Sequence, residues 1–263
     1  YERPHNRRID IPHLMEKARQ RKVGADSVVR RDAMVDLTSA LQPDGTLTWE
    51  VPPGKWTIVR FGRTSTGAMN GGPWNGLDVD KFTPEGVKAG WSGMMQPTIE
   101  RLGPMVGKVL ARCEFDSWEV GGQNWTAKMA EEFRARRGYD PTPFLPALTG
   151  RTVESPAITE RFLWDLRRTV SDLIAENFFR PFAELCRRHG LESMVEPYYG
   201  PFESMICGAQ VDIPMAEFWQ DSDTDSVKMV SSIGHGYGKR IIAAESFTGE
   251  PEKHGRWLDT PYS

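Results

Sequence analysis

Several short apolar runs in this chain end on carboxylates, and this pattern constrains the fold more than any other feature. The runs lie at residues 109–119, 193–199, 211–219 and 241–247. Each begins with aliphatic side chains and ends with acidic and aromatic ones, as expected of buried strands in a parallel sheet. In a barrel of parallel strands the active site lies at the C-terminal ends, so we expect the carboxylates to converge on one pocket.

Segments with helical spacing separate these runs. The longest one places Phe162, Leu166 and Val170 at intervals of four residues, and Gly190 follows its end. Thr83 and Pro84 form a typical helix start, with Thr83 as the N-cap. Helices are expected at residues 84–102, 126–137, 160–188 and about 225–234. The alternation of strands and helices predicts βαβ units and a parallel sheet.

The N-terminal part of the chain has a different pattern. Residues 46–51 and 56–62 alternate at the strand period on either side of a Pro-Pro-Gly-Lys turn, which predicts an antiparallel pair. We therefore expect a β-rich insertion or linker at residues 1–55 and a partial (β/α)8 catalytic domain at residues 56–263. The fold class is α/β, a TIM-type barrel that is incomplete in this chain and has a β-rich N-terminal insertion.

Composition excludes several classes of partner. The chain has 33 Lys+Arg and 36 Asp+Glu with a net charge of -3, which gives no general electrostatic reason to bind nucleic acid. No apolar stretch approaches the roughly 18 residues of a membrane span, so no membrane partner is expected. The three cysteines are widely spaced and indicate neither a disulfide framework nor a metal knuckle. The compartment is left open.

The acids at the strand ends point to a sugar-cleaving chemistry. Glycosidases generally use one protonated carboxyl to release the leaving oxygen and one ionised carboxylate to attack or to activate water. The candidates by position are Glu119, Glu196, Glu217 and Glu245. Any one of them alone is more often an ion-pair or helix-capping residue. Four such acids beside aromatic rings, which can cover the apolar face of a sugar, together favour a carbohydrate site.

A longer block of sequence carries a family resemblance. The string Glu114-Phe-Asp-Ser-Trp-Glu-Val-Gly-Gly-Gln-Asn-Trp125, followed by the blocks at residues 133–140, 161–165, 209–219 and 244–248, resembles the α-L-rhamnosidases of glycoside hydrolase family 106. The blocks fall in the family's order from about Thr46 to Thr248. The resemblance implies a (β/α)8 catalytic domain within a longer multidomain enzyme, inversion of the anomeric configuration, and a calcium cofactor at the sugar site.

The resemblance also implies roles for individual residues. Glu119, Glu217 and Glu245 match the family's active-site glutamates. We expect Glu119 to be the general acid and Glu245 the base that activates water, while Glu217 orients the sugar or joins the calcium shell. The metal ligands are not assigned. The residues expected to bind substrate are Asp116, Trp118, Trp125, Glu196, Tyr198, Trp219 and Phe247.

Two alternatives remain open at this point. We expect the early barrel strands and the final one to lie outside this sequence, and a chain with an incomplete barrel could be a non-catalytic carbohydrate-binding fragment. A related barrel glycosidase acting on another deoxy or uronic sugar would carry a similar set of acids. The expected partners are a carbohydrate substrate and the remainder of a longer chain, and the full-length parent is expected to be periplasmic or secreted.

Overall fold

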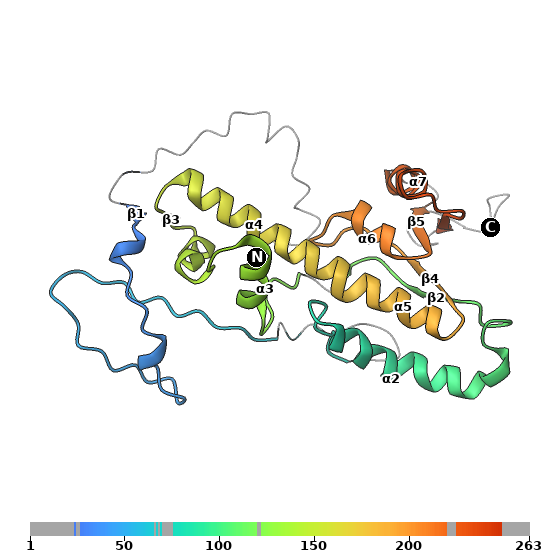
Figure 1. Cartoon of the computed structure of the whole chain (residues 1–263), viewed down its shortest axis with the longest axis horizontal. Coiled ribbons are helices and arrows are strands. Elements are labelled where there is room, and N and C mark those ends of the chain that lie inside the picture. Colours follow the sequence, from blue (N-terminus) through green and yellow to red (C-terminus); the bar gives the residue numbers. More distant parts are fainter. Residues whose placement is uncertain are drawn as a thin grey trace. The chain divides into compact units, whose positions relative to one another are not determined.

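The computed structural model describes residues 24, 27–65, 67, 69, 76–119, 122–219 and 225–248 (Figure 1). These residues form two compact units. The first, called the sheet unit, comprises the described residues of Ser65–Thr126 and Arg167–Ser263. The second unit comprises those of Ile9–Thr64 and Ala127–Leu166. The chain passes from the second unit back to the sheet unit at Leu166–Arg167, within the helix of residues Pro156–Ile174.

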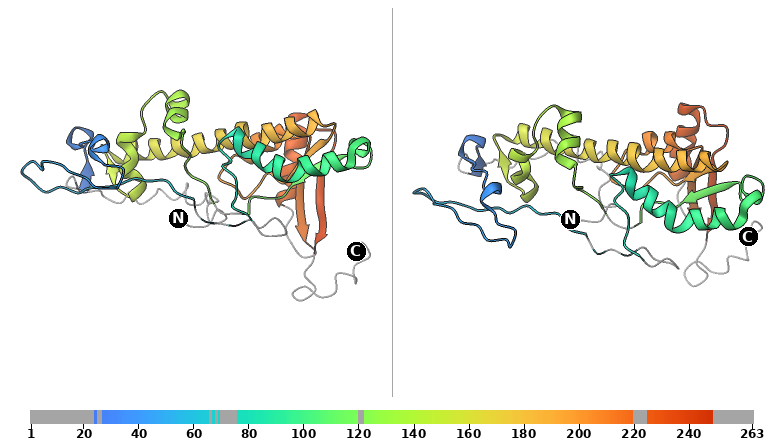
Figure 2. Two further views of the ribbon diagram at one scale, coloured as in Figure 1. Left: turned by 90° about the horizontal axis from the view of Figure 1, so that it is seen from below. Right: turned by 60° about the horizontal axis from the view of Figure 1, so that its bottom comes forward.

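The sheet unit is built on four parallel strands in the order β2-β4-β5-β6. They are β2 (Arg112–Phe115), β4 (Glu192–Val195), β5 (Ile213–Trp219) and β6 (Ala243–Thr248). Figure 2 shows β5 and β6 as neighbouring arrows. Because all four strands run in the same direction, their C-terminal ends lie at one edge of the sheet. This confirms the predicted strands and the parallel sheet, while the described residues form an open sheet and not a closed barrel.

Period-two alternation gives the sheet an apolar face and an acidic face. On the first face Cys113 and Val195 are buried, and the Phe115 ring packs against Phe178 and Phe182 with centroids 4.8 and 4.6 Å apart. Glu114 faces the other way and is exposed. Helices therefore cover the first face, and the acids that follow the strands project from the second.

All of the helices except α6 (Ser204–Gln210) lie where the sequence predicts them. The others are α2 (Pro84–Leu102), α3 (Met129–Arg137), α4 (Pro156–Ile174), α5 (Arg180–Arg188) and α7 (Asp225–Tyr237). The Thr83 side chain accepts a hydrogen bond from Gly86 N, which confirms the predicted N-cap of α2. A π-helical segment, η7 (Ala175–Phe179), links α4 to α5, so the predicted helix over residues 160–188 contains a bulge that its periodicity did not reveal.

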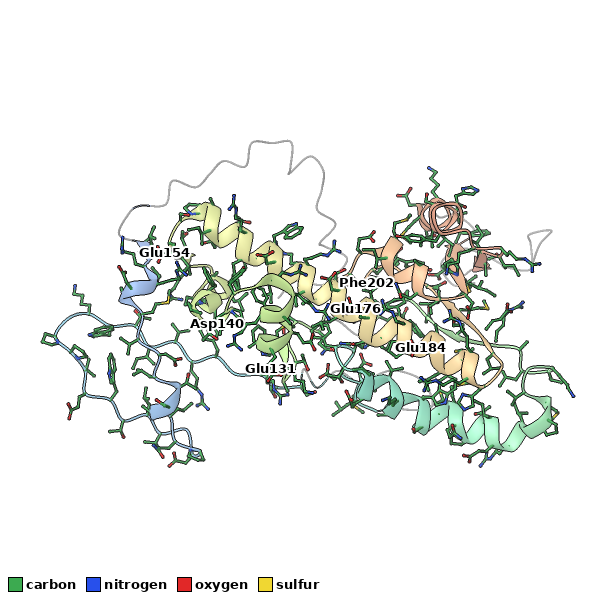
Figure 3. The ribbon with its side chains drawn as sticks, viewed as in Figure 1. Glu131, Asp140, Glu154, Glu176, Glu184 and Phe202 are labelled. Atoms are coloured by element: carbon green, nitrogen blue, oxygen red, sulfur yellow. The ribbon has the colours of Figure 1, made fainter. Side chains whose placement is uncertain are left out.

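The second unit has an aromatic core. Phe133, Tyr139, Phe144 and Phe162 contact one another, and the Tyr139 hydroxyl donates to Asp165 at 2.8 Å. The strands β1 (Val28–Val29) and β3 (Thr152–Val153) pair in parallel beside the short 3-10 helices η3 (Arg31–Ala33), η4 (Thr38–Ala40) and η6 (Thr142–Thr149). Glu154, labelled in Figure 3, forms an ion pair with Arg31.

The antiparallel pair expected at residues 46–62 is wrong: this part of the chain forms no strand, and the nearest pairing is a single bridge between Leu41 and Leu47. The apolar side chains of Val51, Ile58 and Phe61 are exposed, so they pack against no other apolar surface that would bury one face of a hairpin. A two-stranded hairpin without such a surface is only marginally stable.

Cys113, Cys186 and Cys207 are free and buried, in line with the absence of a disulfide pattern in the sequence. None of the helices described here combines the length and the apolar character needed to cross a membrane.

Candidate functional site

Three carboxylates meet at the C-terminal edge of the sheet. Asp116 directly follows β2, Glu196 directly follows β4, and Glu245 lies on β6; one oxygen of each lies within 4.8 Å of the other two. The strand register explains this convergence, since Phe115 pairs with Val195 and the next residues, Asp116 and Glu196, project from the same side. We call Asp116, Glu196 and Glu245 the acid cluster.

Glu196 is the buried member of the acid cluster. Its side chain is 1% exposed, and neither carboxylate oxygen has a hydrogen-bond partner among the described residues. The pKa of Glu196 is raised to about 8, chiefly by burial and in part by Asp116 and the charge of Glu217, while the nearby Tyr198 hydroxyl opposes this rise. An unsatisfied buried carboxyl is costly, so it calls for a proton, an ion or a further polar partner.

Glu217 stands beside the cluster on β5. It is half-buried and is the register partner of Glu245, and the Ser226 hydroxyl donates to its carbonyl oxygen. Its negative charge raises the pKa of both Glu196 and Tyr198, for which burial is the larger cause. The sheet thus places Glu217 and Glu245 side by side, on strands whose ends reach the same edge.

A cavity of about 320 Å³ opens next to the acid cluster. Glu119 is exposed and lines this cavity together with Asp116 and Glu196, while the buried Trp118 forms part of its wall. The remaining lining residues are Asp78, Lys81, Phe115, Ser117, Phe178, Phe179 and Phe202. Phe202 lies beside the helix that carries Glu176 (Figure 3), and its ring is 5.2 Å from that of Phe179. The cavity therefore combines carboxylates with aromatic surface.

The loop after β4 helps to shape this wall. Tyr199 has a left-handed backbone conformation with φ 62°, which is uncommon for a bulky residue. Such strain is found most often at functional sites. The preceding carbonyl, that of Tyr198, accepts a hydrogen bond from Trp118 N at 3.4 Å, so the loops after β2 and β4 are joined. Burial raises the pKa of the Tyr198 hydroxyl above its usual range.

Lys81 is a cavity residue that the sequence did not indicate. Its ammonium forms an ion pair with Asp78 and lies over the Trp118 ring, 4.6 Å from the centroid. Burial lowers the pKa of Lys81 to about 8. Lys81 precedes a helix in an unremarkable polar context, so no local pattern distinguishes it from a surface lysine. Only the fold brings it to Trp118.

The remaining residues that the sequence predicts to bind substrate either do not line the cavity or have side chains that the structure does not describe. Trp125 is half-buried, and its carbonyl accepts a hydrogen bond from Gln123. Trp125 and Tyr198 are not among the described residues that line the cavity, although Tyr198 adjoins Glu196. Trp219 and Phe247 belong to β5 and β6, but their side chains lie outside the described part of the structure.

Three comparisons bear on this site. The model of the family described as alpha-L-rhamnosidase, glycoside hydrolase family 106, matches residues 10–262. The "Putative beta-glucuronidase" of Formosa agariphila is 46% identical over 246 residues, which cover 91% of this chain and 21% of that protein. The solved rhamnosidase from Novosphingobium sp. PP1Y superposes with a TM-score of 0.70 at 31% identity, over 88% of this chain and 25% of that one.

The chain thus spans about a fifth of the length of the curated relative and a quarter of the solved structure it matches. The family match covers nearly all of the sequence, including Glu119 in the loop after β2, Glu217 on β5 and Glu245 on β6. By this match the chain belongs to glycoside hydrolase family 106, the α-L-rhamnosidase family.

Proposed function

We propose that this chain supplies part of the (β/α)8 catalytic barrel of an inverting, calcium-dependent α-L-rhamnosidase. The acid cluster beside a cavity that contains Glu119 is the observation that carries the proposal. Parallel strands with acids at their C-terminal ends are typical of barrel glycosidases. The open four-stranded sheet corresponds to one sector of such a barrel, and the remainder of a longer chain would supply the other strands.

In this proposal the glutamates have separate roles. Glu119 is exposed in the cavity and donates a proton to the oxygen of the leaving group. Glu245 takes a proton from the water that attacks the anomeric carbon from the opposite face of the ring. Glu217, the register partner of Glu245, accepts hydrogen bonds from hydroxyls of the sugar and so orients the ring. Trp118 contributes aromatic surface to the cavity wall.

The acid cluster fits a hard divalent cation. Calcium binds six to eight oxygens at about 2.4 Å, so two of its ligands lie at most about 4.8 Å apart. The carboxylate oxygens of Asp116, Glu196 and Glu245 meet this limit, and Glu196 has no hydrogen-bond partner among the described residues. Asp116 and Glu196 would be the ligands that hold the ion, and the Glu245 carboxylate would lie next to it. When bound, calcium would coordinate the cis 2,3-diol of L-rhamnose and orient the ring.

A uronic sugar is a second candidate substrate. The relative that is 46% identical to this chain is named for β-glucuronidase activity, whereas the solved relative is named a rhamnosidase. The acid cluster would serve either sugar, since both offer vicinal hydroxyls. The choice between them therefore rests on which glycoside the enzyme hydrolyses.

The test is a comparison of substrates with the full-length enzyme. We expect 4-nitrophenyl α-L-rhamnoside to be hydrolysed and 4-nitrophenyl β-D-glucuronide to be left intact. The reverse result would favour the uronic sugar. Calorimetric binding of rhamnose without turnover of either glycoside would favour a non-catalytic carbohydrate-binding role. The variant Glu131→Gln, which changes an exposed acid of α3, should hydrolyse the same glycoside as the unmodified enzyme.

A further inference from the structure

Residues 78–82, which precede helix α2, are fixed in place by contacts with two helical elements. The Asn177 side chain on η7 donates to the Phe82 carbonyl at 2.7 Å. The first turn of α2 approaches so closely that a Cβ on Gly86 would lie 2.1 Å from the Asp80 carbonyl oxygen. Asp80 also accepts a hydrogen bond from Phe82 N at 3.0 Å. We call residues 78–82 the brace segment.

One side of the brace segment contacts the residue before Glu119. The Lys81 ammonium lies over the rings of Trp118 and Phe178, 4.6 and 5.6 Å from their centroids. Asp78 forms an ion pair with this ammonium and so fixes its direction. The Lys81 side chain is only 12% exposed, so the attraction between cation and ring is weakly screened by water.

The other side of the brace segment contacts the residues after Glu119. The Gln123 side-chain carbonyl accepts from Lys81 N at 2.9 Å, and its amide donates to an Asp80 carboxylate oxygen. The Thr126 hydroxyl donates to the second Asp80 oxygen at 2.6 Å. Both oxygens of Asp80 are therefore used to hold the chain that leads away from Glu119. Glu119 itself is exposed and lies in the sequence between Trp118 and Gln123, the nearest attached residues on either side.

We propose that the brace segment positions Glu119, with Lys81 holding Trp118 before it and Asp80 holding Gln123 and Thr126 after it. Lys81 and Asp80 are positioning residues in this proposal, which rests on the proposed role of Glu119 as general acid. A general acid on a loop must be held within hydrogen-bond reach of the leaving oxygen, and an error of about 1 Å can cost on the order of a hundredfold in rate. Contacts on both flanks supply that restraint.

The kinetic test uses two substrates that differ in their need for a proton. Methyl α-L-rhamnoside has a poor leaving group and requires general acid catalysis, whereas 4-nitrophenolate leaves readily without it. In the full-length enzyme we expect Lys81→Met to lower kcat/KM for the methyl glycoside about tenfold more than for the nitrophenyl glycoside. Lys81→Arg should recover most of the loss because it keeps the charge over the ring. Lys88→Met, on the exposed side of α2, is the matched control. Equal losses on both substrates would overturn the proposal.

Hydrogen–deuterium exchange tests the brace segment independently of activity. Peptides covering residues 117–126 should exchange faster in Lys81→Met and in Gln123→Ala than in the wild type or Lys88→Met. Unchanged exchange in both variants would overturn the proposal even if activity falls. If the wild-type enzyme hydrolyses neither rhamnoside, the proposed function fails, and the exchange result alone then decides whether the brace segment restrains this loop.

Discussion

Glu217 and Glu245 are direct register partners on the neighbouring parallel strands β5 and β6. Their side chains therefore project from the same face of the sheet, with Asp116 and Glu196 continuing the acidic surface at the ends of β2 and β4. Burial raises the pKa of Glu196, and the nearby charges of Asp116 and Glu217 add to this rise. Holding several carboxylates close together, one of them buried, costs free energy of folding. Such an arrangement indicates a site that binds a cation or transfers protons.

The two register partners should differ in the kinetic effect of their loss. Glu245→Gln removes the proposed base, and we expect kcat to fall by about 10²- to 10⁴-fold with little change in KM. Glu217→Gln removes a contact to the sugar and should mainly raise KM. Steady-state kinetics of the full-length enzyme on an aryl rhamnoside measure both. Near wild-type kcat in Glu245→Gln would exclude it as the base, and Glu131→Gln should change neither constant.

Removal of calcium should abolish most of the activity. Exhaustive chelation of the intact enzyme is expected to lower kcat, and added calcium should restore it, because Asp116 and Glu196 offer oxygens that a hard cation prefers. Metal analysis before and after chelation is the necessary control. Full activity in an enzyme that is shown to contain no metal would refute the calcium site.

Calcium affinity should rise with pH. The pKa of Glu196 is raised to about 8, chiefly by burial, so at about pH 6 its carboxyl is protonated and calcium must displace that proton. At about pH 9 the carboxylate is already ionised, and the displacement no longer weakens binding. Titration calorimetry of the chelated enzyme at both pH values measures the difference. Glu196→Gln cannot titrate, so this variant should lose most of the pH dependence along with much of the affinity.

The elements that the sequence predicted well have local causes. Thr83 and Pro84 define the start of α2, and Gly138 adopts the left-handed conformation that ends α3. Apolar runs that stop at acids such as Asp116 and Glu196 indicate the strand ends. These signals depend on a few neighbouring residues, and tertiary packing does not override them.

The features that the sequence did not reveal depend on tertiary contacts. Lys81 becomes a cavity residue only because residues 78–82 pack against η7 and the loop after β2. The π-helical segment η7 keeps the apolar spacing of an ordinary helix, so periodicity could not distinguish it. Helix α6 has seven residues, too few for a periodic pattern that would indicate a helix. Residues 46–62 alternate as strands do, but no hairpin forms because their apolar side chains have no other part of the described structure to pack against.

The close approach of α2 to Asp80 gives a prediction about stability. Gly86→Ala would place its methyl group 2.1 Å from a backbone oxygen that a side-chain movement cannot relieve. We expect a loss of about 1–3 kcal/mol in the local free energy of unfolding. Gly93→Ala on the same helix has no atom within 4 Å and should instead stabilise by about 0.5–1 kcal/mol. Hydrogen exchange of α2 peptides across a urea series measures both; equal effects would contradict the close contact.

The stereochemical course of hydrolysis tests the division of roles between Glu119 and Glu245. An inverting enzyme needs room for a water between its base and the anomeric carbon, so the acid and base carboxyls should lie about 6.5–9.5 Å apart, against about 5–5.5 Å for a retaining pair. A crystal structure of the full-length enzyme with a substrate analogue would measure this distance. Proton NMR of the first product provides the decisive result, because inversion of an α-linked rhamnoside must release β-L-rhamnose before mutarotation. Initial release of the α anomer would reject inversion and require one of these glutamates to be a nucleophile.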